Sequence, residues 1–332
     1  MKQKKFIIIS GISVFCLCLC IVLSISYGVK SVGIGDVWDA IRGIHSDKFE
    51  VGVVTTRIPR TVFGILGGAA LAISGAIMQA ITRNPIADPS ILGVNTGASL
   101  FVVCGIAFFH IHNGNQYIWL AFLGAFLTAL FVYRLAASGY GGVTPMKLAI
   151  SGAITATALQ ALVNTIMLPN SQVMDQFRFW QVGSIGGVDW EEIMIVLPYM
   201  LVGFCMSILL ATSFNTLALG DEVATGLGLN VFYVRALGAL AGVLLCASTT
   251  ALAGPIGFIG LMVPHLVRLL IGSDMRKMIP ISAVLGSCVL ILADVAGRLL
   301  GKPAELESGI ITALVGAPVF ISIIRKGKVR SL

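Results

Sequence analysis

Few residues in this chain have the types and spacing that enzyme chemistry requires. A G-x-x-x-x-G-K-[ST] phosphate loop is absent, because the two Gly-Lys pairs are followed by Pro303 and Val329 rather than by Ser or Thr. The zinc-binding H-E-x-x-H pattern and the G-x-S-x-G turn of serine hydrolases are also missing. The residues therefore predict that the chain is not an enzyme and cannot hydrolyse ATP through a phosphate loop of its own.

The residues that bind metals in other proteins are not arranged as ligands here. Cys16, Cys18 and Cys20 alternate by two, which spreads them over about 200° of a helix, and His110 and His112 share this spacing. All seven cysteines fall within apolar segments, where reduced, packed thiols are expected. We expect no disulfide framework, no metal site and no cofactor bound by this chain.

The high share of apolar residues and the length of the uncharged runs indicate the class of protein. Of the 332 residues 57% are apolar and 11% are charged, and the mean hydropathy is +0.96; soluble domains carry about 25% charged residues. Uncharged runs such as 6–29 and 89–133 are long enough to cross a bilayer. The net charge is +7, but the charged residues lie in the short segments between these apolar runs. This placement argues against nucleic-acid binding. We predict an all-α integral membrane protein in which residues 1–332 form a single polytopic domain.

A transmembrane helix needs about 20 residues, and the apolar runs accommodate ten. The first apolar run could instead be a cleaved signal peptide, but it is longer than a usual signal core, so we expect it to remain. Glycine and alanine crowd the second helix, which predicts close helix packing there. The expected helices are 6–27, 61–82, 90–109, 117–136, 148–168, 193–213, 232–253, 258–271, 279–298 and 308–324.

The distribution of Lys and Arg predicts the orientation. Ten crossings place both termini on one side, and that side collects 14 basic and 4 acidic residues, against 8 basic and 11 acidic on the other. Basic loops are retained in the cytoplasm. Both termini are therefore expected to be cytoplasmic.

Several segments resemble one family. The run GGAALAISGAIMQAITRNPIADPSILGVNTGAS at 67–99 resembles the signature of the permease subunits of iron-siderophore, haem and vitamin B12 ABC importers, the FecCD or type II importer family. Segments 219–228, 254–265, 293–298 and 303–318 resemble the same family in the same order. The similarity spans roughly residues 30 to 326. It implies a BtuC-like permease fold of ten transmembrane helices.

The resemblance also implies partners, a cargo and a location. It implies a second permease in a homo- or heterodimer, two cytoplasmic ATPase subunits that bind ATP and Mg²⁺, and an extracytoplasmic substrate-binding protein. The expected place is the bacterial inner or plasma membrane, surrounded by membrane lipid. Ferric siderophore is the expected cargo because it is the commonest in the family, with vitamin B12 and haem as alternatives.

Three arginines match the docking positions of the family. Arg57, Arg60 and Arg298 are implied to contact acidic side chains of the binding protein, for which the planar guanidinium is well suited. The alternative is that they anchor at the membrane interface or pair within the chain with Asp294, Glu305 and Glu307.

A second segment matches the cytoplasmic coupling segment of the family. Residues 220–228 are short, polar and bounded by glycines, as expected of a small helix that contacts the ATPase. Asp221 and Glu222 would lie at its N-terminus, where the helix dipole favours acidic residues, so simple capping is the alternative. The implied contact residues are Leu219, Gly220, Asp221, Glu222, Ala224, Leu227 and Gly228.

The transport pathway is weakly marked. Gln79, Gln160 and Asn164 are candidates for a mildly polar lining, and Thr144 in the 138–145 loop is a candidate for a cytoplasmic gate. An ion-coupled secondary transporter would need carboxylates or a broken helix inside the membrane, which the sequence hardly offers. An intramembrane enzyme would need a catalytic pair, and none is evident.

Overall fold

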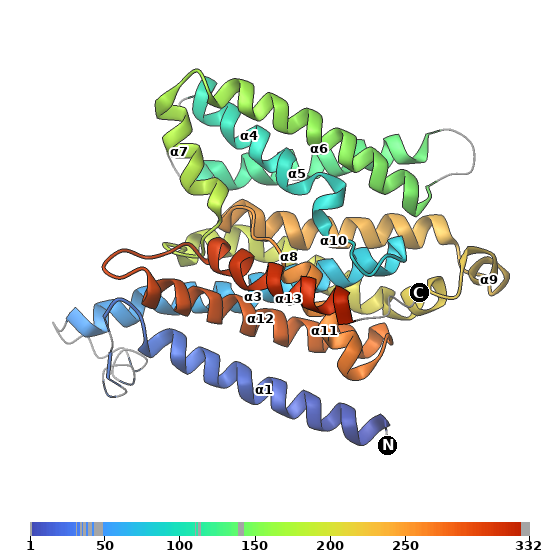
Figure 1. Ribbon diagram of the computed structural model, residues 1–332, viewed down its shortest axis with the longest axis horizontal. Helices are drawn as coiled ribbons and strands as arrows, with labels where there is room; N and C mark the ends of the chain where they lie inside the picture. The colour runs from blue at the N-terminus through green and yellow to red at the C-terminus, as the bar shows by residue number, and fades with distance from the viewer. Residues whose placement is uncertain are drawn as a thin grey trace.

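Helices make up most of the described residues in the computed structural model, which describes residues 2–30, 32, 33, 35, 38, 42, 49–109, 111, 114–138 and 143–326. Within these residues there is no β-strand. The long helices lie side by side along the long axis of the molecule (Figure 1). The helices are α1 (Lys2–Ser26), α3 (Phe49–Thr82), η1 (Pro89–Leu92), α4 (Val94–Phe109), α5 (Gly114–Ala137), α6 (Pro145–Met167), α7 (Ser171–Val182), α8 (Trp190–Leu217), α9 (Asp221–Gly226), α10 (Val231–Ala253), α11 (Ile259–Ile271), α12 (Met275–Leu300) and α13 (Ser308–Lys326).

The ten apolar segments expected from the sequence are helical, although Gly93, with φ of +72°, divides the expected helix 90–109 into η1 and α4. Seven are long and apolar enough to cross a membrane, namely those within α1, α3, α5, α6, α8, α10 and α12, while α4, α11 and α13 are shorter apolar helices. The all-α membrane fold is thus confirmed. Figure 1 places the start of α1 and the end of α13 at the same end of the bundle as α9, which agrees with an even number of crossings. Ten crossings and cytoplasmic termini stay predictions.

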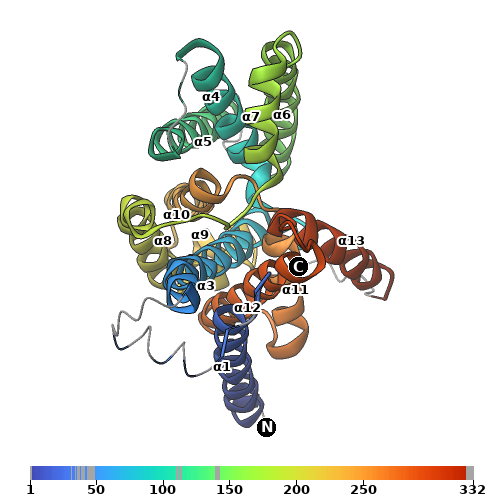
Figure 2. The ribbon, with the colours of Figure 1, turned by 90° about the vertical axis from the view of Figure 1, so that its left-hand side faces the viewer.

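Helix α3 lies at the centre of the bundle. It packs against α1, α8, α10, α11 and α12, and Figure 2 shows it between α8 and α12. Glycines allow this approach, because a Cβ at Gly68 would collide with the carbonyl of Gly286 on α12, and one at Gly75 with that of Gly260 on α11. The predicted packing through small residues is confirmed.

Helix α3 begins earlier than the sequence predicted. The expected start was residue 61, after Pro59, but the helix begins at Phe49 and continues through the proline. Pro59 cannot donate to the carbonyl of Thr55, and Thr55 is exposed, so that carbonyl is free to find another partner. As a consequence Arg57 and Arg60 stand on a helix, one turn apart, rather than on a loop.

Helix α7 was not predicted, because its residues are polar on average. Its signals are nevertheless present. The side chain of Asn170 caps the helix by accepting from the amides of Gln172 and Val173, and Val173 and Phe177, four residues apart, are its buried positions. Figure 2 shows α7 with α4, α5 and α6 on one side of α10.

Candidate functional site

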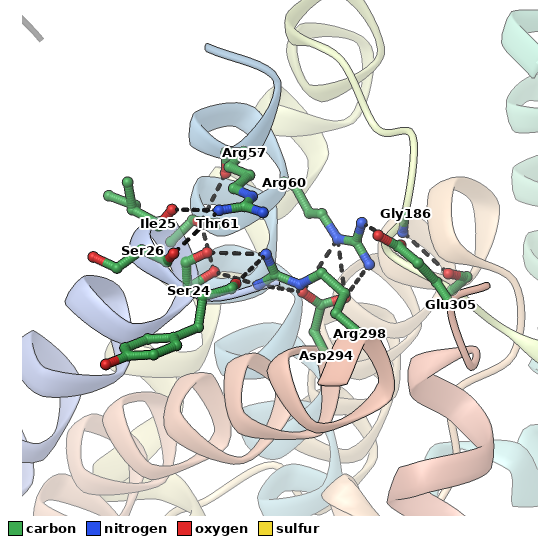
Figure 3. Close-up of polar contacts among 12 residues, drawn as sticks. Ser24, Ile25, Ser26, Arg57, Arg60, Thr61, Gly186, Asp294, Arg298 and Glu305 are labelled. Atoms are coloured by element: carbon green, nitrogen blue, oxygen red, sulfur yellow. Dashed lines mark hydrogen bonds and ion pairs between the residues drawn. The ribbon is translucent and has the colours of Figure 1, made fainter. Parts of the chain in front are cut away.

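Charged side chains gather at the end of the bundle where α1 and α12 end and α3 begins. We call Arg57, Arg60, Asp294, Arg298 and Glu305 the arginine cluster, and Figure 3 shows them pointing toward one another from α3, α12 and the segment after α12. Three of them, Arg57, Asp294 and Arg298, are buried, with 7%, 2% and 1% of their surfaces exposed. Buried charges are retained in proteins only when they are paired and hydrogen-bonded.

Asp294 is the central anion of this cluster. Arg60 donates to its carboxylate through Nη2 at 2.6 Å and through Nε at 3.0 and 3.1 Å. Arg298, one helical turn further along α12, approaches Oδ2 through Nη2 at 2.9 Å, the oxygen that Arg60 Nε contacts at 3.1 Å. One carboxylate thus serves two guanidinium groups, and the second anion, Glu305, accepts from Arg60 Nη1 at 2.7 Å.

The arginines also hold the end of α1. Arg57 donates to the carbonyls of Ile25 at 2.9 Å and Lys30 at 2.6 Å, and Arg298 to those of Ser24 and Tyr27, both at 3.0 Å. The last carbonyls of a helix have no partner within it, so the contacts with Ser24 and Ile25 satisfy carbonyls at the end of α1, and those with Tyr27 and Lys30 fix the segment that follows it. For Arg60 and Arg298 the structure shows the internal pairing that the sequence left open as the alternative to docking.

A cleft opens beside the arginine cluster. It has a volume of about 630 Å³, and its walls include Arg57, Arg60, Arg298, Lys30 and Glu305. The Glu305 side chain is 41% exposed, whereas that of Arg60 is 12% exposed. Asp189 also lines the cleft, so four cations face two carboxylates there, and the ion pair between Arg60 and Glu305 is open to solvent.

A second charged cluster lies at the opposite end of α3. We call Arg83, Asp221 and Arg235 the α9 cluster, because the Asp221 carboxylate joins α9 to an arginine beyond α3 and one on α10. Arg235 donates to Asp221 at 3.0 Å and to the carbonyl of Val143 at 2.9 Å. Burial and the nearby Arg235 lower the pKa of Arg83, so these two cations need an anion, which Asp221 supplies.

The predicted small helix at 220–228 is confirmed as α9. Gly220 and Gly228 bound it with φ of +109° and +83°, a region that favours glycine. Ala224 is buried, while Leu219, Leu227 and Glu222 are exposed. Among the described residues Asp221 bonds to arginines rather than to the amides of α9, so it is more than a cap, and Glu222 has no ion pair.

The four pathway candidates differ in their surroundings. Gln79 is fully buried and accepts from Arg268 at 2.8 Å, so it joins α3 to α11 and, contrary to expectation, lies at no surface of the chain. Thr144 caps α6 by accepting from Lys147, and residues 139–142 of the expected gate lie outside the described residues. Gln160 donates to Asn164 at 3.2 Å on the exposed side of α6.

Comparison with known proteins agrees with this architecture. The model of the FecCD transport family matches residues 16–326. The chain is 39% identical to the ferric enterobactin transport system permease protein FepD of Escherichia coli, over 92% of this chain and 91% of FepD. It is also 39% identical to the Fe(3+)-citrate import system permease protein YfmD of Bacillus subtilis, with the same coverage.

A solved structure has the same fold over nearly the whole chain. It is assigned to the metal-chelate type of ABC transporter, in an inward-facing conformation. The match has a TM-score of 0.83 and 26% identity and covers 98% of this chain and all of that one. With a family model that spans most of its length and relatives this similar, the chain belongs to the FecCD transport family.

Proposed function

We propose that this chain is the permease subunit of an ABC importer that moves a ferric siderophore across a bacterial inner or plasma membrane into the cytoplasm. The observation that supports it best is a polar, uncharged face on α6. Thr157, Gln160 and Asn164 lie on one side of this helix, and Thr157 and Asn164 are exposed. Polar side chains within a membrane face the protein interior or water rather than lipid.

A second permease would complete the pathway. The polar face of α6 is not covered by any other described residue of this chain, and a partner across a water-filled path would cover it. Such a wall holds no charge to bind a ferric complex tightly, which suits a cargo that slides after release. Both relatives compared above are named for ferric complexes, enterobactin and citrate, and this favours a ferric chelate over vitamin B12 or haem.

The arginine cluster is proposed as the docking surface for an extracytoplasmic binding protein. Because Arg57 and Arg298 hold the end of α1, Arg60 is the arginine best placed to change partners. Its pair with Glu305 is exposed and therefore weak, worth about 0–1 kcal/mol. An acidic side chain that enters the cleft can take the place of Glu305 without disturbing Asp294.

The α9 end is proposed as the contact for one of the two cytoplasmic ATPase subunits, which bind ATP and Mg²⁺. The exposed Leu219, Glu222 and Leu227 would face the ATPase. Asp221 faces the chain itself and would pass a displacement of α9 to the ends of α3 and α10. In this proposal Asp221 anchors α9 to its own chain, and the neighbouring Glu222 contacts the ATPase.

Labelling of single cysteines tests the α6 pathway. In a cysteine-free background, Thr157→Cys near the middle of α6 should react with a membrane-impermeant thiol reagent in the assembled importer, because water reaches it. The matched control is Val202→Cys near the middle of α8, whose site is 51% exposed in this chain and is expected to face lipid. Labelling at Val202→Cys that equals or exceeds labelling at Thr157→Cys would contradict the pathway assignment.

The energy source separates this proposal from an ion-coupled transporter. Uptake should continue when an uncoupler collapses the ion gradients while cellular ATP is held constant, and it should stop when ATP is depleted. The physical reason is that Asp294, the carboxylate furthest inside a described membrane helix, is already held in ion pairs with Arg60 and Arg298 and so is not available to carry a coupling ion. Collapse of uptake by the uncoupler alone would favour the secondary transporter.

A further inference from the structure

An apolar groove runs along the outside of the bundle beside the central helix. It is about 670 Å³ in volume and lies between α3, α8 and α12. Ala69, Ala211 and Ala283, one from each helix, leave it open, and Phe204 and Ile208 form part of its wall. This volume lies within the range of small-molecule sites, about 300–1,000 Å³.

The groove runs from the middle of α8 and α12 to the ends of these helices on the α9 side. Its α8 wall extends from Phe204 to Thr212, which at about 1.5 Å per residue corresponds to about 12 Å along the helix. That length fits within one leaflet of a hydrocarbon core about 30 Å thick. Phe204 and Ala283 lie toward the middle of their helices, whereas Thr212 and Arg276 lie near the helix ends on the α9 side.

A cation lies at the end of the groove nearest the membrane surface. Arg276 is exposed and donates through Nε to Thr212 Oγ1 at 3.2 Å. Its two terminal nitrogens have no acceptor among the described residues. The neighbouring carboxylate, Asp274, caps α12 and accepts from Asn215 at 2.8 Å, while Lys277 lies over the ring of Phe6.

We propose that this groove binds an anionic phospholipid, with an acyl chain along Ala69, Ala211 and Ala283 and the phosphate on Arg276. A guanidinium with Nε already held presents two parallel donors, the geometry that phosphate oxygens accept. Basic pockets between helices at a membrane surface are known to recognise anionic headgroups. A groove that is open to the bilayer must contain lipid, and the bilayer supplies the acyl chain that fills it. This assignment is independent of the cargo and of the importer partners.

Native mass spectrometry of the full-length chain in detergent tests the site. Phosphatidylglycerol should remain bound more tightly than phosphatidylcholine, and Arg276→Gln should weaken phosphatidylglycerol about tenfold, the loss expected for one charged hydrogen-bonded contact, while leaving phosphatidylcholine unchanged. Arg134→Gln, an exposed arginine at the end of α5 with the same change of charge, should have no effect. Ala283→Leu should displace both lipids by filling the groove.

A competition experiment distinguishes a phospholipid ligand from free phosphate. Inorganic phosphate at millimolar concentration should not compete, because it has no chain to bury. Equal binding of the two lipids by the wild-type chain, or unchanged phosphatidylglycerol binding in Arg276→Gln, would overturn the proposal. A change in oligomeric state with Ala283→Leu would also overturn it, since the groove would then hold a second copy. Ala211→Leu repeats the test if Ala283→Leu does not fold.

Discussion

Replacing Asp294 by Asn is expected to lower the free energy of unfolding by about 3–5 kcal/mol, the cost of leaving a buried charge without its partner. Asp294 is 2% exposed and is the shared anion of Arg60 and Arg298. Without it Arg298, which is 1% exposed, keeps hydrogen bonds to neutral groups at and just after the end of α1, and no ion pair with another described residue. Thermal unfolding in detergent should show a large fall in the midpoint and a smaller folded fraction.

Glu305→Gln is the matched control for this prediction. It removes an equal charge from the same Arg60, but at a side chain that is 41% exposed. We expect a loss of about 0–1 kcal/mol, as for surface ion pairs. The double variant Asp294→Asn with Arg298→Met should recover part of the stability, because it removes the unpaired cation as well. If Asp294→Asn and Glu305→Gln were equally stable, Asp294 would not be the central anion of the arginine cluster.

Asp221→Asn is expected to loosen α9 and to reduce uptake at least about tenfold. The carboxylate holds α9 to Arg83 and Arg235, and the Arg235 side chain is 4% exposed. Loss of such a charged hydrogen-bonded partner costs roughly 1–3 kcal/mol, and a tenfold change in an equilibrium corresponds to about 1.4 kcal/mol. Hydrogen exchange of the α9 amides in the isolated permease should accelerate, a change that does not depend on any partner.

Glu222→Gln is the neighbouring control. Glu222 is exposed and has no ion pair among the described residues, so hydrogen exchange in α9 should stay as in the wild-type chain. A fall in transport-coupled ATPase activity with unchanged exchange would identify Glu222 as a contact to the ATPase. If the α9 amides of both variants exchanged as slowly as in the wild-type chain, and transport-coupled ATPase activity stayed normal, the two carboxylates would act only as favourable charges at the start of a helix.

The sequence predicted most of the fold because membrane helices are marked by their composition. Each expected apolar range overlaps a helix, and the small residues of α3 lie at its closest contacts, as with Gly68 and Gly286. The missed features were those in which local rules compete. Continuation of α3 through Pro59 overrides a strong breaking signal, and α7 is too polar to be found by hydropathy, although the Asn170 cap indicates it.

The sites were harder to predict, because their partners are far apart in the chain. The pairing of Arg298 with Asp294 follows from their spacing of four residues on one helix, and it was an open alternative. The contacts of Arg57 with carbonyls of α1, and of Gln79 with Arg268, depend on which helices become neighbours. Spacing along the chain contains no information about such pairs, so it could not separate buried anchors from exposed contacts.

Uptake of radioactive iron tests the central proposal most directly. Cells with and without this gene, in a strain without redundant importers, would receive iron as ferric hydroxamate, catecholate and citrate complexes, alongside haem and labelled vitamin B12. We predict that loss of the gene abolishes uptake of one class of ferric complex and leaves haem and vitamin B12 unchanged. Loss of haem or vitamin B12 uptake alone would overturn the assignment of a ferric siderophore as the cargo. Unchanged uptake of every compound would contradict the role of this chain as an importer permease.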